Sequence, residues 1–406
     1  MRVRYTIHCY PLLYIQQLLV LRQRATMNRM KTFDDIEVRR PALAQSYLGL
    51  LAAQPGRPLA LFAPRRIGKT FFLDHDLAPE AQQSGFLTIY ADLWLNKSAP
   101  LEAINHALEE VLDTLQVPSS AVGRVAKTPV TKVSILGSGI ELGEEPSPRP
   151  LPDKPALRLD ALVTRLAAKH QGKLLLMLDE VQALADVPDG VDVIAALRAV
   201  LHTKRKVLHA VFTGSSQEGL AVLMTSVGSP MYQFAQILTF PSLGDDFLQP
   251  LANHFSKVHP GKQLDRAELR AVFMKVGFKP ALMRDLVKAM SSEGITDVHL
   301  GLARYVSSDA QMSLWGALLN GCSAFDQGVL VAVAQGLPPL SAQTLRELAA
   351  IPGANPTIGK VRTALSNLKR AGILTKAGAG TVVDDPLFAE YLAKRRIASR
   401  ANAGKP

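Results

Sequence analysis

The chain has 406 residues, 48% of them hydrophobic, which is enough to bury two or three separate cores and excludes a largely disordered polypeptide. Its formal net charge of +11 is uneven: residues 1–40 hold eight Lys and Arg against three acids, and residues 340–406 hold eleven against four. We therefore expect any polyanionic partner at the C-terminal end. Only Cys9 and Cys322 occur, which excludes a disulfide framework and predicts a reducing, cytoplasmic setting.

The first 30 residues are predicted to form an extension outside the folded core. The apolar run 5–21 follows a basic start, as in a signal peptide, but polar residues and a proline interrupt it and no small-residue cleavage site follows. Such a run is also marginal for crossing a bilayer. No integral membrane span is therefore predicted, and a membrane-surface anchor is the alternative.

A phosphate-binding loop is predicted between a strand at 58–62 and a helix at 71–84. The template G-x-x-x-x-G-K-[ST] is matched everywhere except at its first glycine, which is Ala63 here. In such a loop the backbone N–H groups wrap the phosphates, Lys69 reaches the β- and γ-phosphates, and the Thr70 hydroxyl holds Mg²⁺. The predicted phosphate-binding residues are Ala63, Pro64, Arg65, Arg66, Ile67, Gly68, Lys69 and Thr70.

A second motif ends the uninterrupted apolar strand predicted at 173–178. It consists of Asp179 and Glu180, the expected form of a Walker B strand end. The carboxyl ends of parallel strands open onto the ligand crevice of an α/β sheet, so Asp179 is predicted beside the metal. Glu180 is then predicted to be the catalytic base that orients and deprotonates the attacking water.

The rest of the segment up to about residue 215 alternates helix and strand, which predicts a parallel α/β sheet. The further strand candidates are 86–92 and 207–213, with a helix at 101–116. The stretch 129–142 resembles a glycine-turned hairpin, and the proline-rich stretch 144–155 resembles an exposed linker.

Polar residues after the last of these strands are candidates for sensing the γ-phosphate. They are Thr213, Ser215 and Ser216, with Ser215 assigned as a catalytic residue. Serines that follow a glycine serve equally well as helix caps, so that alternative stays open. Residues 244–310 carry helical periodicity with a break at 277–280, which predicts a small helical lid. Lys279 or Arg284 of this lid could reach the phosphates, and solvated surface positions are the alternative for both.

The C-terminal segment predicts three helices and a hairpin, the arrangement of a winged helix-turn-helix. Its third helix, 357–370, is basic, and the predicted contacts with double-stranded DNA are Lys360, Arg362, Lys369 and Arg370. Winged helices also bind proteins, and a basic tail can simply be solvated. The predicted division is an extension at 1–30, an ATPase core at 31–243, a lid at 244–312 and a winged-helix domain at 313–406.

Together these motifs resemble the archaeal-type P-loop ATPases of the AAA+ and STAND-like group, relatives of the origin-recognition ATPases. The resemblance covers residues 31–395, and its most telling parts are Ala63-Pro-Arg-Arg-Ile-Gly-Lys-Thr70 and Leu178-Asp-Glu-Val-Gln182. It implies a P-loop sheet core with a helical lid and a winged helix. It also implies ATP and Mg²⁺ as ligands, with Lys69 and Thr70 on phosphate and metal and Ser215 at the sensor position.

The sequence departs from that group at two places. A Cβ at Ala63 restricts positive φ where a glycine is usual. The stretch Tyr232-Gln-Phe-Ala235 lacks the arginine that members often carry there, which predicts slow turnover if that arginine acts between subunits.

The leading functional prediction is a Mg²⁺-dependent ATPase that acts as a nucleotide-controlled switch on DNA, a protein partner or a second copy. The alternatives are an ATP-liganded DNA-binding regulator with negligible hydrolysis and a P-loop small-molecule kinase.

Overall fold

The computed structural model describes residues 32–115, 150–185, 187–214, 224, 229–377 and 380–397. The predicted extension at 1–30, the predicted hairpin at 129–142, residues 144–149 of the predicted linker, and Ser215 and Ser216 lie outside the described residues.

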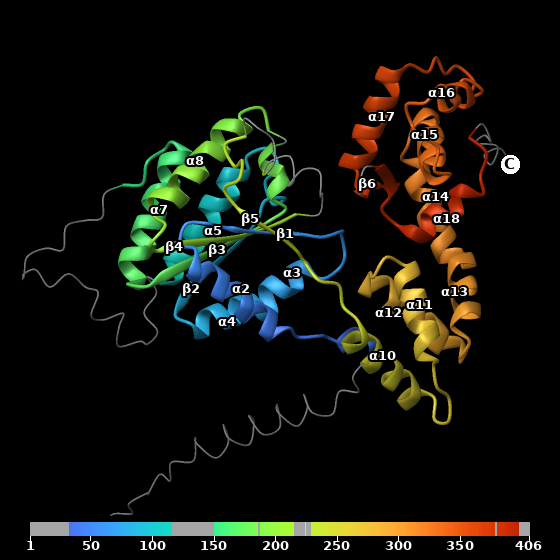
Figure 1. Ribbon diagram of the computed structural model, residues 1–406, viewed down its shortest axis with the longest axis horizontal. Helices are drawn as coiled ribbons and strands as arrows, with labels where there is room; N and C mark the ends of the chain where they lie inside the picture. Colours follow the sequence, from blue (N-terminus) through green and yellow to red (C-terminus); the bar gives the residue numbers. More distant parts are fainter. Residues whose placement is uncertain are drawn as a thin grey trace, which may run out of the picture.

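A five-stranded parallel sheet forms the centre of the N-terminal part (Figure 1). The strand order is β2-β3-β4-β1-β5, and every neighbouring pair is parallel. The α/β class and the first four strands were predicted, and the structure confirms them; the fifth strand was not predicted. The bounds are β1 Leu59–Phe62, β2 Phe86–Asp92, β3 Lys173–Asp179, β4 Leu208–Gly214 and β5 Gln236–Thr239.

Helices cover both faces of this sheet because its central strands are apolar on both sides. In β3, Leu174 and Leu176 pack into one core while Leu175 and Met177 pack into the other, as the two-residue period of a strand requires. The first face is covered by α5 (Pro100–Thr114), α7 (Pro155–His170) and α8 (Gly190–Thr203). The second is covered by α2 (Pro41–Ala53) and the continuous run α3 (Lys69–Phe72), η2 (Leu73–Leu77) and α4 (Ala78–Gln83).

The C-terminal part is helical and lies beside the carboxyl edge of the sheet (Figure 1). Its first four helices fall within the predicted lid segment 244–312, a fifth crosses the predicted boundary, and the predicted break lies between α11 and α12. These five helices are α10 (Asp245–Val258), α11 (Arg266–Lys275), α12 (Pro280–Glu293), α13 (Val298–Ser307) and α14 (Asp309–Asn320).

The last elements follow in the order expected of a winged helix-turn-helix. Three helices precede an antiparallel hairpin, and a fourth helix closes the unit. Side chains of Ser323, Ser341 and Thr357 cap the three helices, each by accepting a backbone N–H of the first turn. The elements are α15 (Ala324–Ala334), α16 (Ala342–Leu348), α17 (Ile358–Arg370), β6 (Leu374–Ala377), β7 (Gly380–Val383) and α18 (Pro386–Ala393).

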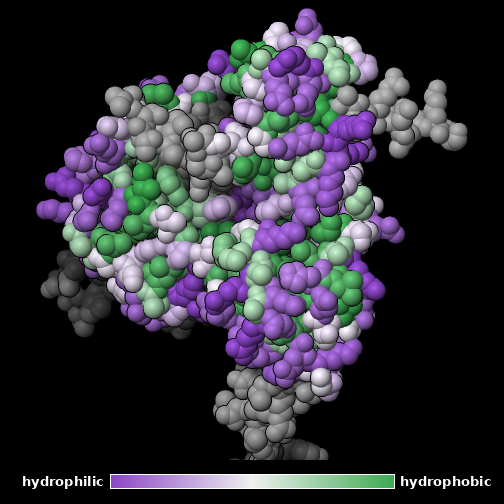
Figure 2. Space-filling model, turned by 45° about the vertical axis from the view of Figure 1, so that its right-hand side comes forward, coloured by the Kyte–Doolittle hydropathy of each residue, from purple (hydrophilic) through white to green (hydrophobic). Residues whose placement is uncertain are grey.

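One continuous hydrophobic core joins α10–α14 to the elements from α15 to α18. It runs from Phe247 in α10 to Leu392 in α18, with the fully buried Trp315 among its members. Phe33 and Ile36 from the segment before α2 also belong to it, so the N-terminal segment is fixed against the lid. Hydrophilic residues predominate on the outer surface of this helical part (Figure 2). Within the described residues, no helix is long and apolar enough to span a bilayer.

Candidate functional site

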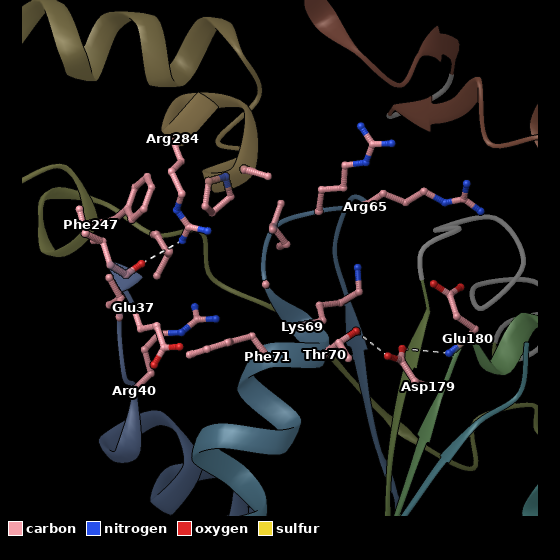
Figure 3. Close-up of a pocket in the computed structure, with 18 of the residues that line it drawn as sticks. Glu37, Arg40, Arg65, Lys69, Thr70, Phe71, Asp179, Glu180, Phe247 and Arg284 are labelled. Atoms are coloured by element: carbon pink, nitrogen blue, oxygen red, sulfur yellow. Dashed lines mark hydrogen bonds between the residues drawn. The ribbon is translucent and has the colours of Figure 1, made fainter. Parts of the chain in front are cut away.

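A cavity of about 570 Å³ lies between the carboxyl edge of the sheet and the lid helices (Figure 3). Its sheet end comes from the phosphate-binding loop and the end of β3, and its helical end from the segment before α2 and from α10 and α12. The lining residues are Ile36, Glu37, Val38, Arg40, Arg65, Arg66, Ile67, Gly68, Lys69, Thr70, Phe71, Trp94, Asp179, Glu180, Leu243, Phe247, Pro280, Ala281 and Arg284.

Lys69 lies at the start of α3 and is only 7% exposed. Its Nζ donates hydrogen bonds to the carbonyl oxygens of Ala63 (2.9 Å) and Pro64 (2.8 Å), which curl the loop around the ammonium group. Burial lowers the pKa of Lys69 to about 8, the carboxylates of Glu180 and Asp179 oppose this change, and the Arg65 guanidinium adds to it. An anion at this site would stabilise the charged amine and raise this pKa again.

Asp179 is the most thoroughly held side chain of the site. Its Oδ2 accepts from the Thr70 hydroxyl at 2.6 Å and from the Tyr90 hydroxyl at 3.3 Å. Its Oδ1 accepts from the backbone N–H of Glu180 at 3.0 Å and from the Thr213 hydroxyl. Burial and the neighbouring Asp179 carboxylate raise the pKa of Tyr90, so its hydroxyl keeps its proton and remains a donor. The donors that hold the carboxylate come from β2, from the residue after β3, from β4 and from the start of α3.

Glu180 follows β3 with a left-handed backbone, φ 58°. A non-glycine residue rarely adopts this conformation, which turns its side chain off the line of the strand. Gln182 donates through Nε2 to Oε2 of Glu180, which orients the carboxylate toward the cavity it lines. The close-up shows Lys69, Thr70, Asp179 and Glu180 gathered at one end of the cavity (Figure 3).

The backbone of the loop accommodates its unusual first residue. Ala63 is not among the described non-glycine residues with a positive φ, so its Cβ brings no left-handed strain. Left-handed conformations occur instead at Arg66 (φ 63°) and Gly68 (φ 93°). A Cβ on Gly68 would meet nothing within 4 Å, so glycine is needed there for its backbone freedom rather than for space.

The helical end of the cavity carries arginines. Arg284 donates from Nη2 to the carbonyl of Ile36 at 2.9 Å, while its buried Nε has no hydrogen-bond partner within the described part of the chain. Arg40 lies 4.2 Å from the ring centroid of Phe240 and donates to the carbonyl of Pro241 at 2.8 Å. Burial lowers the pKa of Arg40.

Structural comparisons identify the fold around this site. A structure of the Walker-type ATPase of Pyrococcus abyssi superposes with a TM-score of 0.55 and 17% sequence identity, over 88% of this chain and 96% of that one. The chain has the fold of the AAA+ P-loop ATPases.

Two further structures are less similar to this chain. The ORC1 protein of Aeropyrum pernix in complex with DNA has a TM-score of 0.46 and 15% identity, over 88% of this chain and 94% of that one. The ORC2 protein of the same organism, in ADPNP–ADP complexes, has a TM-score of 0.48 and 16% identity, over 86% and 90%. No protein-family model matches the sequence, and no curated protein matches it.

The sequence-predicted residues occupy three places in this AAA+ fold. Arg65 through Thr70, Asp179 and Glu180 line the cavity, whereas Ala63 and Pro64 lie just behind it as acceptors for Lys69. The four predicted DNA-contacting residues belong to α17, where Lys360, Arg362 and Arg370 are exposed and Lys369 is half-buried. Ser215 lies outside the described residues.

Of the two lid candidates, one lines the cavity and one does not. Arg284 faces it, but Lys279 is buried against Asp384, which directly follows β7. Sequence reasoning missed Tyr90 and Trp94, although both come at or just after the end of a predicted strand, where parallel sheets gather their polar and ligand-contacting groups. It also missed the segment Ile36–Arg40, for which no motif gives a signal.

Proposed function

We propose that this protein binds ATP with Mg²⁺ in the cavity, hydrolyses it, and passes the change to DNA or a protein partner through its C-terminal winged helix. The observation that carries the proposal is the convergence of Lys69, Thr70, Asp179 and Glu180 on one cavity, although the two pairs are about 110 residues apart in the sequence.

The donors at the sheet end fit a triphosphate. Lys69, Arg65 and Arg66 bring three cationic side chains to the loop. The first N–H groups of the helical run that begins at Lys69 have no intrahelical acceptors, so they are available to phosphate oxygens. The cavity volume lies in the ordinary range of small-ligand sites.

The oxygen donors fit a magnesium ion. Asp179 and Thr70 already lie 2.6 Å apart, and carboxylate and hydroxyl oxygens are the ligands that Mg²⁺ uses beside substrate phosphates. When bound, the ion would neutralise charge that develops on the transferring phosphoryl group. Thr213 and Tyr90 hold Asp179 in one orientation, so little reorganisation is needed.

Hydrolysis needs a base at the end of β3. The Glu180 carboxylate would take a proton from a water whose oxygen forms a bond to the γ-phosphorus as the bond to the β-phosphate oxygen breaks. The products are ADP and inorganic phosphate. Gln182 keeps the carboxylate oriented through its hydrogen bond to Oε2.

The test is ATP hydrolysis by the wild-type chain, Lys69→Ala and Glu180→Gln, each measured with and without duplex DNA. We expect Lys69→Ala to lose ATP binding and Glu180→Gln to bind ATP without turning it over. A wild type that binds ATP but releases no phosphate contradicts the hydrolase and supports the ATP-liganded regulator. Phosphate that appears only on an added small acceptor supports the kinase.

The winged-helix part of the proposal rests on the basic α17. Charge-removing changes there, Lys360→Ala with Arg362→Ala, should weaken duplex binding at least several-fold at low salt and flatten its salt dependence. Lys206→Ala, an equally exposed lysine in the turn before β4, is the matched control. Unchanged duplex binding in the α17 variant would leave a protein partner as the target.

A further inference from the structure

The winged helix touches the phosphate-binding loop directly, and it does so at a glycine. Gly372 lies two residues beyond α17, with φ +71°, and the guanidinium of Arg65 occupies the space beside it. A Cβ on Gly372 would overlap Nη1 of Arg65 and come within 2.7 Å of its Cζ. The guanidinium is the far end of a flexible side chain, so Arg65 must leave this position if residue 372 has a side chain.

Arg65 has aromatic and backbone neighbours but no anionic partner. Its guanidinium carbon lies 5.1 Å from the ring centroid of Trp94, and the side chain lines the cavity next to Lys69. No carbonyl or carboxylate within the described ranges accepts a hydrogen bond from it. A guanidinium carries a planar fork of N–H donors that matches the geometry of phosphate oxygens. A phosphate oxygen in the cavity would therefore satisfy the donors of Arg65.

A buried ion pair fixes the winged helix where this contact forms. Lys279 Nζ lies 2.7 Å from Oδ2 of Asp384, and the two side chains are 3% and 10% exposed. Lys279 immediately precedes α12, whose first residues, Pro280 and Ala281, line the cavity. The Asp384 carboxylate also opposes the lowering of the Lys69 pKa, with the smallest effect among its charged neighbours.

We propose that Arg65 is the residue that couples the nucleotide to the winged helix: it binds the terminal phosphates of the nucleotide while Gly372 supports it from behind. This inference rests on the proposed function. Because α17 ends two residues before Gly372, the predicted DNA-binding helix and the phosphate-binding loop are joined through one side chain.

Coupling of this kind is reciprocal. If the docked winged helix holds Arg65 ready for phosphate, then a bound triphosphate must favour docking of the winged helix by the same factor. A nucleoside diphosphate, which lacks the terminal phosphate, should favour docking less. Docking of the winged helix should therefore be stronger before hydrolysis, with ATP bound, than after it, with ADP bound.

The test is Gly372→Ala, measured as the affinity for a non-hydrolysable ATP analogue by calorimetry. We expect about a tenfold loss, the size of a charge-assisted hydrogen bond to phosphate, and a smaller loss for ADP. Gly353→Ala is the matched control, because Gly353 also has a positive φ (+74°) and belongs to the winged helix, but a Cβ there meets nothing within 4 Å. Equal affinities in the two variants would overturn the proposal.

A double-mutant cycle separates coupling from general damage. In an Arg65→Ala background the space beside Gly372 is open, so Gly372→Ala should cause no further loss of affinity. Additive losses would show that the two residues act independently and would contradict the inference. Arg65→Lys should recover only part of the affinity, since an ammonium group lacks the planar fork.

Amide hydrogen exchange gives a readout that does not depend on catalysis. The ATP analogue should slow exchange in β6 and β7 of the wild type but not of Arg65→Ala, and ADP should slow it less. Analogue binding without this protection would overturn the coupling while leaving the proposed function intact. A wild type that binds no analogue would instead remove the proposed function itself.

Discussion

The two ends of the cavity hold their charged side chains in different ways. At the sheet end, Asp179 accepts from four donors, and Lys69 donates to two carbonyls of its own loop. At the helical end, Arg284 has one carbonyl acceptor, the Ile36 oxygen, and a buried Nε without a partner inside the described ranges. Arg65, between them, stacks on the Trp94 ring and lies against Gly372, and within the described residues no carbonyl or carboxylate accepts a hydrogen bond from it.

This difference means that the sheet end, around Asp179, keeps one geometry, whereas the arginines Arg65 and Arg284 can change their contacts. A carboxylate with both oxygens satisfied keeps one geometry with or without a ligand, which suits an electrostatic role. Arginines with unused donors gain contacts only when an anion or a ligand atom arrives, so their segments can respond to it. We therefore expect the sheet end to set the chemistry and the helical end to sense which nucleotide is bound.

The largest expected effect comes from the buried ion pair between Lys279, just before α12, and Asp384, just after β7. Lys279→Ala leaves the Asp384 carboxylate buried without its partner, which should cost about 3–5 kcal/mol in the free energy of unfolding of the helical part. The measurement is denaturant unfolding followed by the fluorescence of the fully buried Trp315, in a Trp94→Phe background.

A matched exposed pair provides the control for that prediction. Lys275 and Glu390 join α11 to α18, at 2.9 Å, but their side chains are 50% and 46% exposed. Lys275→Ala should cost less than about 1 kcal/mol. Similar losses for Lys279→Ala and Lys275→Ala would mean that burial does not distinguish the two anchors.

The next largest effect is expected at the sheet end. Thr213→Val keeps the shape of a fully buried side chain but removes one hydroxyl donor from Asp179, which should destabilise the N-terminal part by about 1–3 kcal/mol. Calorimetric unfolding measures this loss. Thr88→Val is the control. Thr88 lies on β2, and its half-buried hydroxyl accepts a hydrogen bond from Gln82, so its loss should change stability by less than about 0.5 kcal/mol. An unchanged free energy of unfolding in Thr213→Val would contradict the idea that these hydrogen bonds hold Asp179 in one geometry.

The smallest effect near neutral pH concerns Lys69. Its pKa of about 8 means that the amine is charged below pH 8 in the free protein and loses its proton above it. Bound phosphate favours the charged amine, so binding above pH 8 must take up a proton and affinity should fall by up to about tenfold per pH unit. Affinity below pH 8 should be insensitive to this group.

Calorimetry in buffers of different ionisation enthalpy measures that proton uptake. Lys69→Met should remove the dependence, because no amine remains to titrate. The terminal phosphate of the ligand ionises near about pH 6, well below the range that reports on Lys69. Proton uptake that persists in Lys69→Met would assign the titration to another group.

Local patterns predicted most of the sheet. Apolar runs located β1, β3 and β4 to within one residue, because strands buried on both faces are largely apolar, and the partly exposed β2 was located as well. The strand β5 escaped notice because it has only four residues and alternates between half-buried and exposed positions. Helix α18 was not predicted either, although the Asp385 cap and Pro386 are the usual signals of a helix start.

The candidate site was also predicted only in part. The two motifs predicted that Lys69, Thr70, Asp179 and Glu180 would share a cavity, because parallel strands bring their carboxyl ends to one edge whatever their separation in the chain. The catalytic and binding roles of these residues remain predictions that the experiments above test.

The amino-acid sequence by itself determined the first four strands, the loop after β1 and the acidic end of β3, since each depends on short-range periodicity and on residue types at fixed spacing. Only the tertiary structure decided that Lys279 pairs with Asp384, that Arg284 reaches Ile36, and that Arg65 rests on Gly372. These contacts join segments from about 100 to 300 residues apart. Their partners are set by how whole helices pack on one another, and no local pattern encodes that packing.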